Sequence, residues 1–244
     1  PSASKRHRSG QSVEVGDRVQ QLFATLSDPD VIPLGAALPD EELFPTERLA
    51  SHLARVAHDS NPRTYGSNPH GHESLRLAFA QRSLLSGCAF DASELVVTNG
   101  CTEAISLSLQ VVTEPGDTVA IQSPTYFGFL LLLEKLGLRA LELPTSSQTG
   151  VALNDLEHVL SQEEVSALLL TPTFSNPTGS LLPEDDKQRL YDLLEIHDLP
   201  LIEDDIYGDL YFGSSRPKPI KAFDTDGRVL YCSSVSKTMT PEYR

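Results

Sequence analysis

The sequence predicts an α/β fold, in which helices cover both faces of a mainly parallel sheet. Segments with the 3.6-residue period of an amphipathic helix alternate with short apolar runs of β-forming residues. Such alternation is typical of a parallel sheet, because the connection between two parallel strands passes through a helix. The 244 residues are enough to bury a large hydrophobic core.

The expected elements follow one another from residue 46 onward. The expected helices are 46–57, 73–85, 102–112, 127–136, 153–160 and 184–197. The expected strands are 94–98, 118–122, 140–143, 167–171, 199–203 and 229–233. Turn residues agree with these bounds, since Pro183 precedes an acidic first helical turn and Gly137 follows a helix.

The chain divides into two expected parts. Residues 1–30 start with a polar stretch, 1–16, that carries a basic cluster at 5–8 and few apolar side chains. Such a composition predicts a tail or linker. Residues 31–244 are expected to form one domain.

Composition excludes several classes of function. Asp and Glu number 34 against 19 Lys and Arg, a formal net charge of −15. Nucleic acids and anionic membranes are bound by basic faces, so we expect neither to bind this segment directly. The longest apolar run, 127–133, is far shorter than the roughly 20 residues that span a bilayer. Three widely spaced cysteines without a CxxC pair argue against disulfides and structural zinc, and favour the cytoplasm.

In a parallel sheet, ligands bind beyond the carboxyl ends of the strands. The residues that directly follow each expected strand are therefore the candidates for ligand binding. Gly100, Cys101 and Thr102 follow the first expected strand and open a helix, an arrangement that suits an anion. An alternative is that Thr102 only caps the helix. Cys101 as a nucleophile is disfavoured, because no base accompanies it in the sequence.

Two further strand ends carry an aromatic ring and an amide. Tyr126 lies at a strand-to-helix turn, where it can stack on a flat ligand or simply be half-buried. Asn176 stands between Pro172, Pro177 and Gly179, which fix the backbone around it. Its side-chain amide can donate to a ligand oxygen.

The last two strand ends carry charge. Residues 203–205 are three acids at the end of an apolar strand, followed by Tyr207. Buried acids need a positive partner, but no histidine at ligand spacing accompanies them, so we expect no metal. Lys237 follows the final strand between small hydroxyl residues, although an exposed lysine is the simpler alternative. Together these groups suit a phosphorylated aromatic aldehyde bound as a Schiff base.

As a set, these motifs resemble the large domain of the fold-type-I aminotransferases of class I and II, which depend on pyridoxal 5′-phosphate (PLP). The resemblance covers nearly the whole chain from about residue 31. It rests on residues 175–179 (SNPTG), on Asp204-x-x-Tyr207, and on Ser234-x-Ser236-Lys237 with Arg244 seven residues later. Residues 33–39, 98–104, 123–128 and 203–212 further resemble the MocR-type branch of the GntR-family regulators. Those proteins join a winged helix-turn-helix to an aminotransferase-like effector domain.

The resemblance implies a role for each matching residue. Lys237 would hold PLP as a Schiff base and shuttle protons as the free amine, while Asp204 would pair with the pyridine nitrogen. The ring hydroxyl would bond to Tyr207 and Asn176, and Tyr126 would stack on the ring. The phosphate would be held by Gly100, Cys101, Thr102, Ser234, Ser236 and Arg244.

Three positions extend or depart from the pattern. Tyr65 resembles a tyrosine that reaches the phosphate of the partner subunit, which implies a homodimer. Gly35 resembles a backbone element beside the substrate carboxylate. Glu242 stands where the family usually has glycine, close to the phosphate site. The family continues beyond Arg244 into a small domain with the arginine that binds the substrate carboxylate, so we expect this chain to lack efficient transamination.

The resemblance predicts a PLP-binding domain of a MocR-type regulator that senses a small amino compound. DNA would be read by a winged helix-turn-helix outside this chain. A free-standing class I/II aminotransferase acting on an amino acid is the alternative. A remnant that has lost PLP is disfavoured, because every type of residue that would face the cofactor is present.

Overall fold

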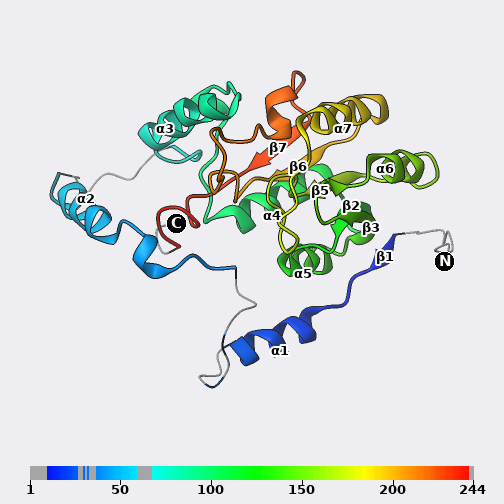
Figure 1. Ribbon diagram of the computed structural model, residues 1–244, viewed down its shortest axis with the longest axis horizontal. Coiled ribbons are helices and arrows are strands. Elements are labelled where there is room, and N and C mark those ends of the chain that lie inside the picture. Colours follow the sequence, from blue (N-terminus) through cyan, green and yellow to red (C-terminus); the bar gives the residue numbers. More distant parts are fainter. Residues whose placement is uncertain (1–9, 27–29, 31, 33–36, 60–67, 242–244) are drawn as a thin grey trace.

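The computed structural model describes residues 10–26, 30, 32, 37–59 and 68–241 (Figure 1). Its centre is a seven-stranded sheet with the order β1-β3-β2-β5-β6-β7, and β4 pairs with β3 outside this path. The strands are β1 Gln11–Ser12, β2 Thr118–Ser123, β3 Arg139–Ser146, β4 Gly150–Val151, β5 Ala167–Leu170, β6 Leu201–Asp204 and β7 Val229–Cys232. The pairs from β3 to β7 are parallel, which confirms the predicted mainly parallel sheet.

Seven α-helices connect or flank these strands within the described residues. They are α1 Gly16–Leu26, α2 Thr46–Asp59, α3 Glu73–Ser83, α4 Cys101–Val112, α5 Phe127–Lys135, α6 Leu153–Leu160 and α7 Glu184–His197. The expected helices from residue 46 onward agree with α2 to α7 to within a few residues at either end. None of the described helices is long and apolar enough to cross a membrane.

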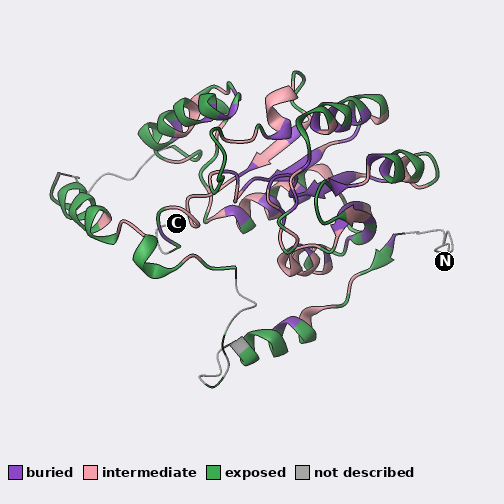
Figure 2. Cartoon of the chain, in the orientation of Figure 1, coloured by how far each residue is buried: buried purple, intermediate pink, exposed green. Residues whose placement is uncertain are grey.

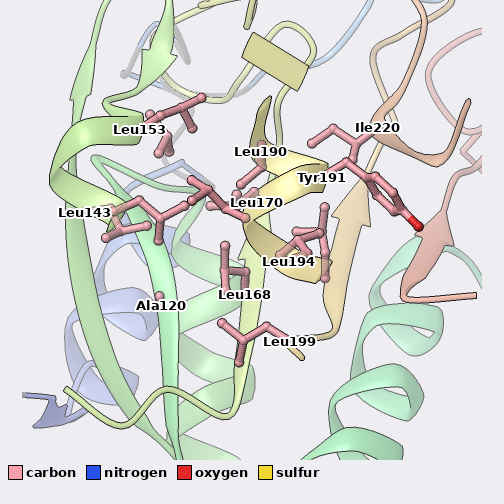
Figure 3. Packing of buried hydrophobic residues seen from close by; sticks show 14 of the residues in the cluster. Ala120, Leu143, Leu153, Leu168, Leu170, Leu190, Tyr191, Leu194, Leu199 and Ile220 are labelled. Carbon is pink, nitrogen blue, oxygen red and sulfur yellow. The ribbon is translucent and has the colours of Figure 1, made fainter. Parts of the chain in front are cut away.

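The hydrophobic core has two halves, one on each face of the sheet. Leu168 and Leu170 of β5 pack with α6 and α7, whereas Ala167 and Leu169 pack with α4 and α5. Successive strand residues point to opposite faces, so one buried strand feeds both halves. Figure 3 shows Leu190 and Leu194 of α7 among the strand leucines of the first half, and Figure 2 shows the buried strands between exposed outer helix faces.

The strand order reverses between β2 and β5. From β2 the chain passes through α5 to β3 on one side, and it then returns through α6 to β5 on the other side of β2. Such a switch point opens a crevice at the carboxyl ends of the strands, where ligands bind in open α/β sheets. The loops after β2, β5, β6 and β7 all start at this end of the sheet.

The predicted strand at 94–98 is wrong. Residues 92–94 form a 3-10 helix, and the backbone N–H of Val97 bonds to the carbonyl of His70 rather than to a strand. Val96 and Val97 remain 57% and 39% exposed. A β-forming run becomes a strand only beside another strand, and none of the described strands pairs with this run.

The polar N-terminal stretch contains more structure than a linker. Gln11 pairs with Ala140 at the edge of the sheet, and α1 follows at once. Glu134 of α5 accepts hydrogen bonds from the backbone N–H groups that begin α1, each at 2.9 Å. Val19 of α1 is buried. The prediction of a tail is therefore wrong for residues 11–26, because the edge of the sheet supplies partners that the composition of this segment does not reveal. The division into domains at residue 30 stays a prediction.

Candidate functional site

The carboxyl ends of β5, β6 and β7 bring four predicted site residues together. Asp204 is the last residue of β6, and Lys237 lies in a turn that follows β7. Tyr207 lies three residues after β6, and its hydroxyl accepts a hydrogen bond from Asn176 Nδ2 at 3.3 Å. The Lys237 amine nitrogen lies 5.9 Å from the centre of the Tyr207 ring. Loops from three adjacent strands thus meet at one place.

Asp204 is buried among groups that act directly on its charge. Its Oδ1 accepts hydrogen bonds from the Ile206 backbone N–H at 3.2 Å and from the Cys101 thiol at 3.4 Å. Burial raises the pKa of Asp204 to about 7, and these hydrogen bonds oppose the rise. A cation placed against this carboxyl would favour its ionised form.

Lys237 is only partly exposed, unlike the freely solvated lysine of the simpler alternative. Its Nζ donates to the backbone carbonyl of Ala37 at 2.7 Å. Burial lowers the pKa of Lys237, and the charge of Asp204 opposes that effect. More of the amine is therefore neutral at a given pH than on a solvated lysine, and the neutral amine is the form that attacks a carbonyl carbon.

Tyr126 directly precedes α5, with its ring edge-on to Phe129 at 5.6 Å between ring centres. Burial raises the pKa of Tyr126, and the charge of Asp204 adds to this rise. A Cβ atom added at Gly128 would overlap the Tyr126 ring. The glycine thus provides the space that this ring position requires.

The start of α4 carries the predicted anion site. Gly100 is the N-cap residue with a φ of 83°, a backbone conformation that glycine adopts without strain. The idea that Thr102 caps the helix is wrong, because Thr102 lies inside α4 and is exposed. Gly100 and Ser234 both line a cavity of about 500 Å³ between α3 and β7. Ser234 Oγ accepts a hydrogen bond from the Ser236 backbone N–H at 3.1 Å, which shapes the turn before Lys237.

The three consecutive acids at the end of β6 have separate partners. Glu203 accepts hydrogen bonds from two backbone N–H groups at the start of the 3-10 helix 220–223, at 2.8 and 2.9 Å. Asp205 is paired with Arg216 and also accepts a hydrogen bond from the Tyr231 hydroxyl. The positive partner that the acids required is therefore Arg216, which the sequence analysis did not single out.

Gln122 near the end of β2 is a second residue that the sequence analysis missed. Its Nε2 donates to Ser175 Oγ at 2.8 Å, and its Oε1 accepts from the Thr171 backbone N–H at 2.9 Å. These two bonds cross the switch point and fix the loop that carries Asn176. The only signal in the sequence was an amide inside an apolar strand, where an unpaired polar group would be costly.

Some predicted residues lie outside the described residues, and the structure places none of them. They are Tyr65, Gly35 and Arg244, together with the unusual Glu242. Within the described parts of the chain, no group of three or more His, Cys, Asp or Glu side chains could hold a metal ion.

Comparisons with known proteins identify the family of this chain. The family model for class I and II aminotransferases matches residues 29–240. The chain is 39% identical over 235 residues to the HTH-type transcriptional regulator YdcR of Escherichia coli K12, covering 96% of this chain and 50% of the relative. It is 30% identical over 234 residues to aromatic-amino-acid aminotransferase 1 of Thermococcus litoralis, covering 93% and 56%. The chain thus spans about half the length of the curated relatives that it matches.

Solved structures give the same fold. The α-aminoadipate aminotransferase LysN of Thermus thermophilus, solved with N-(5′-phosphopyridoxyl)-L-leucine, superposes with a TM-score of 0.77 at 31% identity, over 84% of this chain and 52% of that chain. The kynurenine aminotransferase of Pyrococcus horikoshii gives a TM-score of 0.83 at 28% identity, over 92% and 57%. The fold and the matched residues lead to one conclusion: this chain belongs to the family of class I and II aminotransferases.

Proposed function

We propose that this chain is the PLP-binding, effector-sensing domain of a MocR-type transcriptional regulator. The observation that carries the cofactor assignment is the meeting of Lys237, Asp204 and the Asn176–Tyr207 pair at the carboxyl ends of three adjacent strands. The regulator assignment is supported by the similarity to YdcR, an HTH-type regulator, over 96% of this chain.

The described side chains fit PLP in their chemistry. An amine with a lowered pKa suits the aldehyde, and a carboxyl whose pKa is raised by burial suits the pyridinium nitrogen, whose charge would favour the ionised carboxylate. The hydroxyl and amide of Tyr207 and Asn176 suit the ring oxygen, and the glycine-led start of α4 suits the phosphate. When bound, PLP would supply an electron sink for a substrate carbanion.

Each residue then has a defined task. Lys237 would hold the cofactor covalently and carry a proton at Nζ after its release. Asp204 would hold the proton on the pyridine nitrogen. Tyr126 would orient the ring by stacking. The phosphate would be bound by Gly100, Cys101, Thr102, Ser234, Ser236 and Arg244, with Tyr65 reaching across from a second subunit and Gly35 beside the effector.

The first experiment tests the cofactor. The protein is mixed with PLP, reduced with borohydride and digested, and the peptides are analysed by mass spectrometry. We expect a phosphopyridoxyl group on Lys237, and its loss in Lys237→Ala. The exposed Lys135 provides the matched control, because Lys135→Ala should leave the labelling of Lys237 unchanged. Wild-type protein with no label on Lys237 would refute the cofactor assignment.

A second experiment separates the regulator from the alternative, a free-standing aminotransferase. The full-length gene product is tested for DNA binding, with and without PLP and amino acids. DNA binding that changes with an amino compound supports the regulator. Turnover of about 1–1000 per second without DNA binding would support the enzyme instead.

The proposal includes a homodimer in the cytoplasm. The outer face of α2 carries Leu53 and Val56, which are 54% and 57% exposed, and Figure 2 shows this helix as mostly exposed. A second copy would cover this face and bring Tyr65 to the phosphate. The three free, buried cysteines agree with a reducing compartment. Light scattering should give twice the mass of the chain.

A further inference from the structure

A buried thiol contacts the carboxyl group that the proposed function assigns to the pyridine nitrogen. Cys101 is the first residue of α4, and Asp204 is the last residue of β6. The Cys101 sulfur lies 3.4 Å from Asp204 Oδ1, and the two residues are only 7% and 6% exposed. The contact joins two chain segments that are 103 residues apart.

The thiol is the donor in this contact. Burial raises the pKa of Cys101 well above its ordinary value, and the charge of Asp204 adds to the rise. The sulfur therefore keeps its proton at physiological pH, and it is the donor whenever Asp204 is ionised, because a carboxylate can only accept. The same property makes Cys101 a poor nucleophile, because the reactive form of cysteine is the thiolate.

The donors around Asp204 leave room for one more. The Cys101 thiol and the Ile206 backbone N–H both bond to Oδ1. A carboxylate offers about four acceptor positions, two on each oxygen, so these two donors leave room for an external N–H group. Because the donors come from different elements, the carboxyl plane cannot rotate without breaking a hydrogen bond.

We propose that Cys101 is a positioning residue, whose thiol holds the Asp204 carboxylate ionised and oriented toward the pyridine nitrogen of PLP. This inference rests on the proposed function. It gives Cys101 a second role besides its backbone at the phosphate turn, since the S–H···O bond links the two ends of the cofactor site. The start of α4 and the end of β6 are then held at a fixed separation.

Several other groups affect the charge of Asp204. They are Asp205 and Tyr207 in the loop after β6, Tyr126 before α5, Cys232 at the end of β7, and Lys237 in the turn that follows. A test must therefore change the thiol alone. Cys232→Ala is the matched control, because it also truncates a buried thiol of the same core half. Burial raises the pKa of Cys232 to about 12, so its thiol is neutral and its removal takes no charge away from the surroundings of Asp204. Cys232 bonds to Ser108 and to the Leu230 carbonyl rather than to Asp204.

The test measures the dissociation constant of PLP between pH 5 and pH 9 for the wild-type protein and three variants. Cys101→Ala should weaken PLP binding about five- to tenfold, less than the loss of an ordinary hydrogen bond to a charged group, because a thiol is a weak donor. Its loss of binding on acidification should also begin at a higher pH, because Asp204 protonates more readily. Cys101→Ser keeps a donor, so its affinity and pH profile should stay within about twofold of wild type, as should those of Cys232→Ala.

The outcomes distinguish this inference from the proposed function. If wild-type protein binds no PLP, the proposed function and this inference both fail. If wild type binds PLP but Cys101→Ala behaves like Cys232→Ala, only the positioning role fails. If Cys101→Ser loses binding and its pH profile as completely as Cys101→Ala, the side-chain donor is not what matters, and the inference also fails.

A second measurement needs neither PLP nor a Cys101 variant that folds. In protein carrying Cys88→Ser and Cys232→Ser, the infrared S–H stretching band comes from Cys101 alone. Adding Asp204→Asn, which replaces the charged acceptor, should shift this band to the higher frequency of a more weakly bonded thiol. An unchanged band would overturn the proposal.

Discussion

The Lys237 amine nitrogen donates to the backbone carbonyl of Ala37, at 2.7 Å and 200 residues away in the chain. The contact ties the turn after the last strand to the segment that precedes α2. Ala37 follows Gly35 by two residues, and Gly35 was predicted to lie beside the effector. Together with that prediction, the contact implies that an incoming amino compound would arrive close to Lys237.

The lowered pKa of Lys237 predicts selective reactivity. At pH 8, a limiting amount of an amine-specific reagent should modify Lys237 faster than Lys135, because more of the buried amine is neutral. The difference should shrink as the pH approaches 10.5, the ordinary pKa of lysine. Peptide mass spectrometry measures both rates in one sample. Equal rates at pH 8 would contradict the lowered pKa of Lys237.

The raised pKa of Asp204 predicts how stability changes with pH. The folded protein without cofactor holds a proton up to about pH 7, whereas an unfolded aspartate releases it near 3.8. This stabilisation is complete below pH 4 and is lost as the pH rises through 7, by at most about 1.4 kcal/mol per pH unit. Glu203, with a pKa also near 7, adds a second contribution of the same sign.

Urea unfolding at pH 5 and pH 8 measures this dependence. Asp204→Asn should reduce the difference in unfolding free energy between the two pH values, because the amide does not titrate. The exposed Glu195 of α7 provides a control, and Glu195→Gln should leave the difference unchanged. A pH dependence of wild-type size in Asp204→Asn would show that Asp204 is not the titrating group.

The buried pair of Asp205 and Arg216 predicts a large loss of stability on truncation. Their side chains are 0% and 9% exposed, so Arg216→Ala would leave a buried carboxylate without its cation. Such a change costs about 3–5 kcal/mol. Arg189 pairs with Glu157 at the surface, and Arg189→Ala should cost less than about 1 kcal/mol. Denaturant unfolding measures the stability of both variants. Similar losses of unfolding free energy in Arg216→Ala and Arg189→Ala would contradict the prediction.

Gly128 lies in α5, where helix propensity alone would favour alanine. Alanine normally stabilises a helix by up to about 1 kcal/mol relative to glycine. In Gly128→Ala, however, the new Cβ overlaps the Tyr126 ring, so the ring must move and PLP binding should weaken. Gly213→Ala is the matched control, because its nearest non-neighbouring atom is 3.9 Å away.

A double variant shows whether Gly128→Ala weakens PLP binding by displacing the Tyr126 ring. In a Tyr126→Ala background, Gly128→Ala should have little further effect on PLP affinity, because the displaced ring is gone. An undiminished effect in that background would show that Gly128 acts through the backbone of α5 rather than through Tyr126.

Alternation of helices and strands was enough to predict the fold, because each buried strand has its own apolar run. The segment 94–98 shows where this fails, since Val96 and Val97 have strand composition but no strand beside them. The region 11–26 shows the converse. Its polar residues fold against Glu134 and the edge of β3, and neither partner is visible in the local sequence.

Short motifs were enough to predict that Lys237 and Asp204 lie at the carboxyl ends of neighbouring strands, and their roles there stay a prediction. Parts of the site were missed where a polar residue acts across the sheet, as with Gln122 and Arg216. Such contacts depend on which strands become neighbours, and a pattern within one segment does not contain that information. The side-chain contact of Cys101 was missed for the same reason, because its acceptor is 103 residues away.

The distance along the chain between Ala37 and Lys237 also limits how the protein can assemble. Contacts between residues so far apart form late in folding, because a long loop must close first. During synthesis, β2, β3, β5 and β6 can pair before Lys237 has left the ribosome, but the amine that would capture PLP is not yet available. Because Lys237 follows all four strands in the chain, their pairing cannot depend on a cofactor bound to this amine.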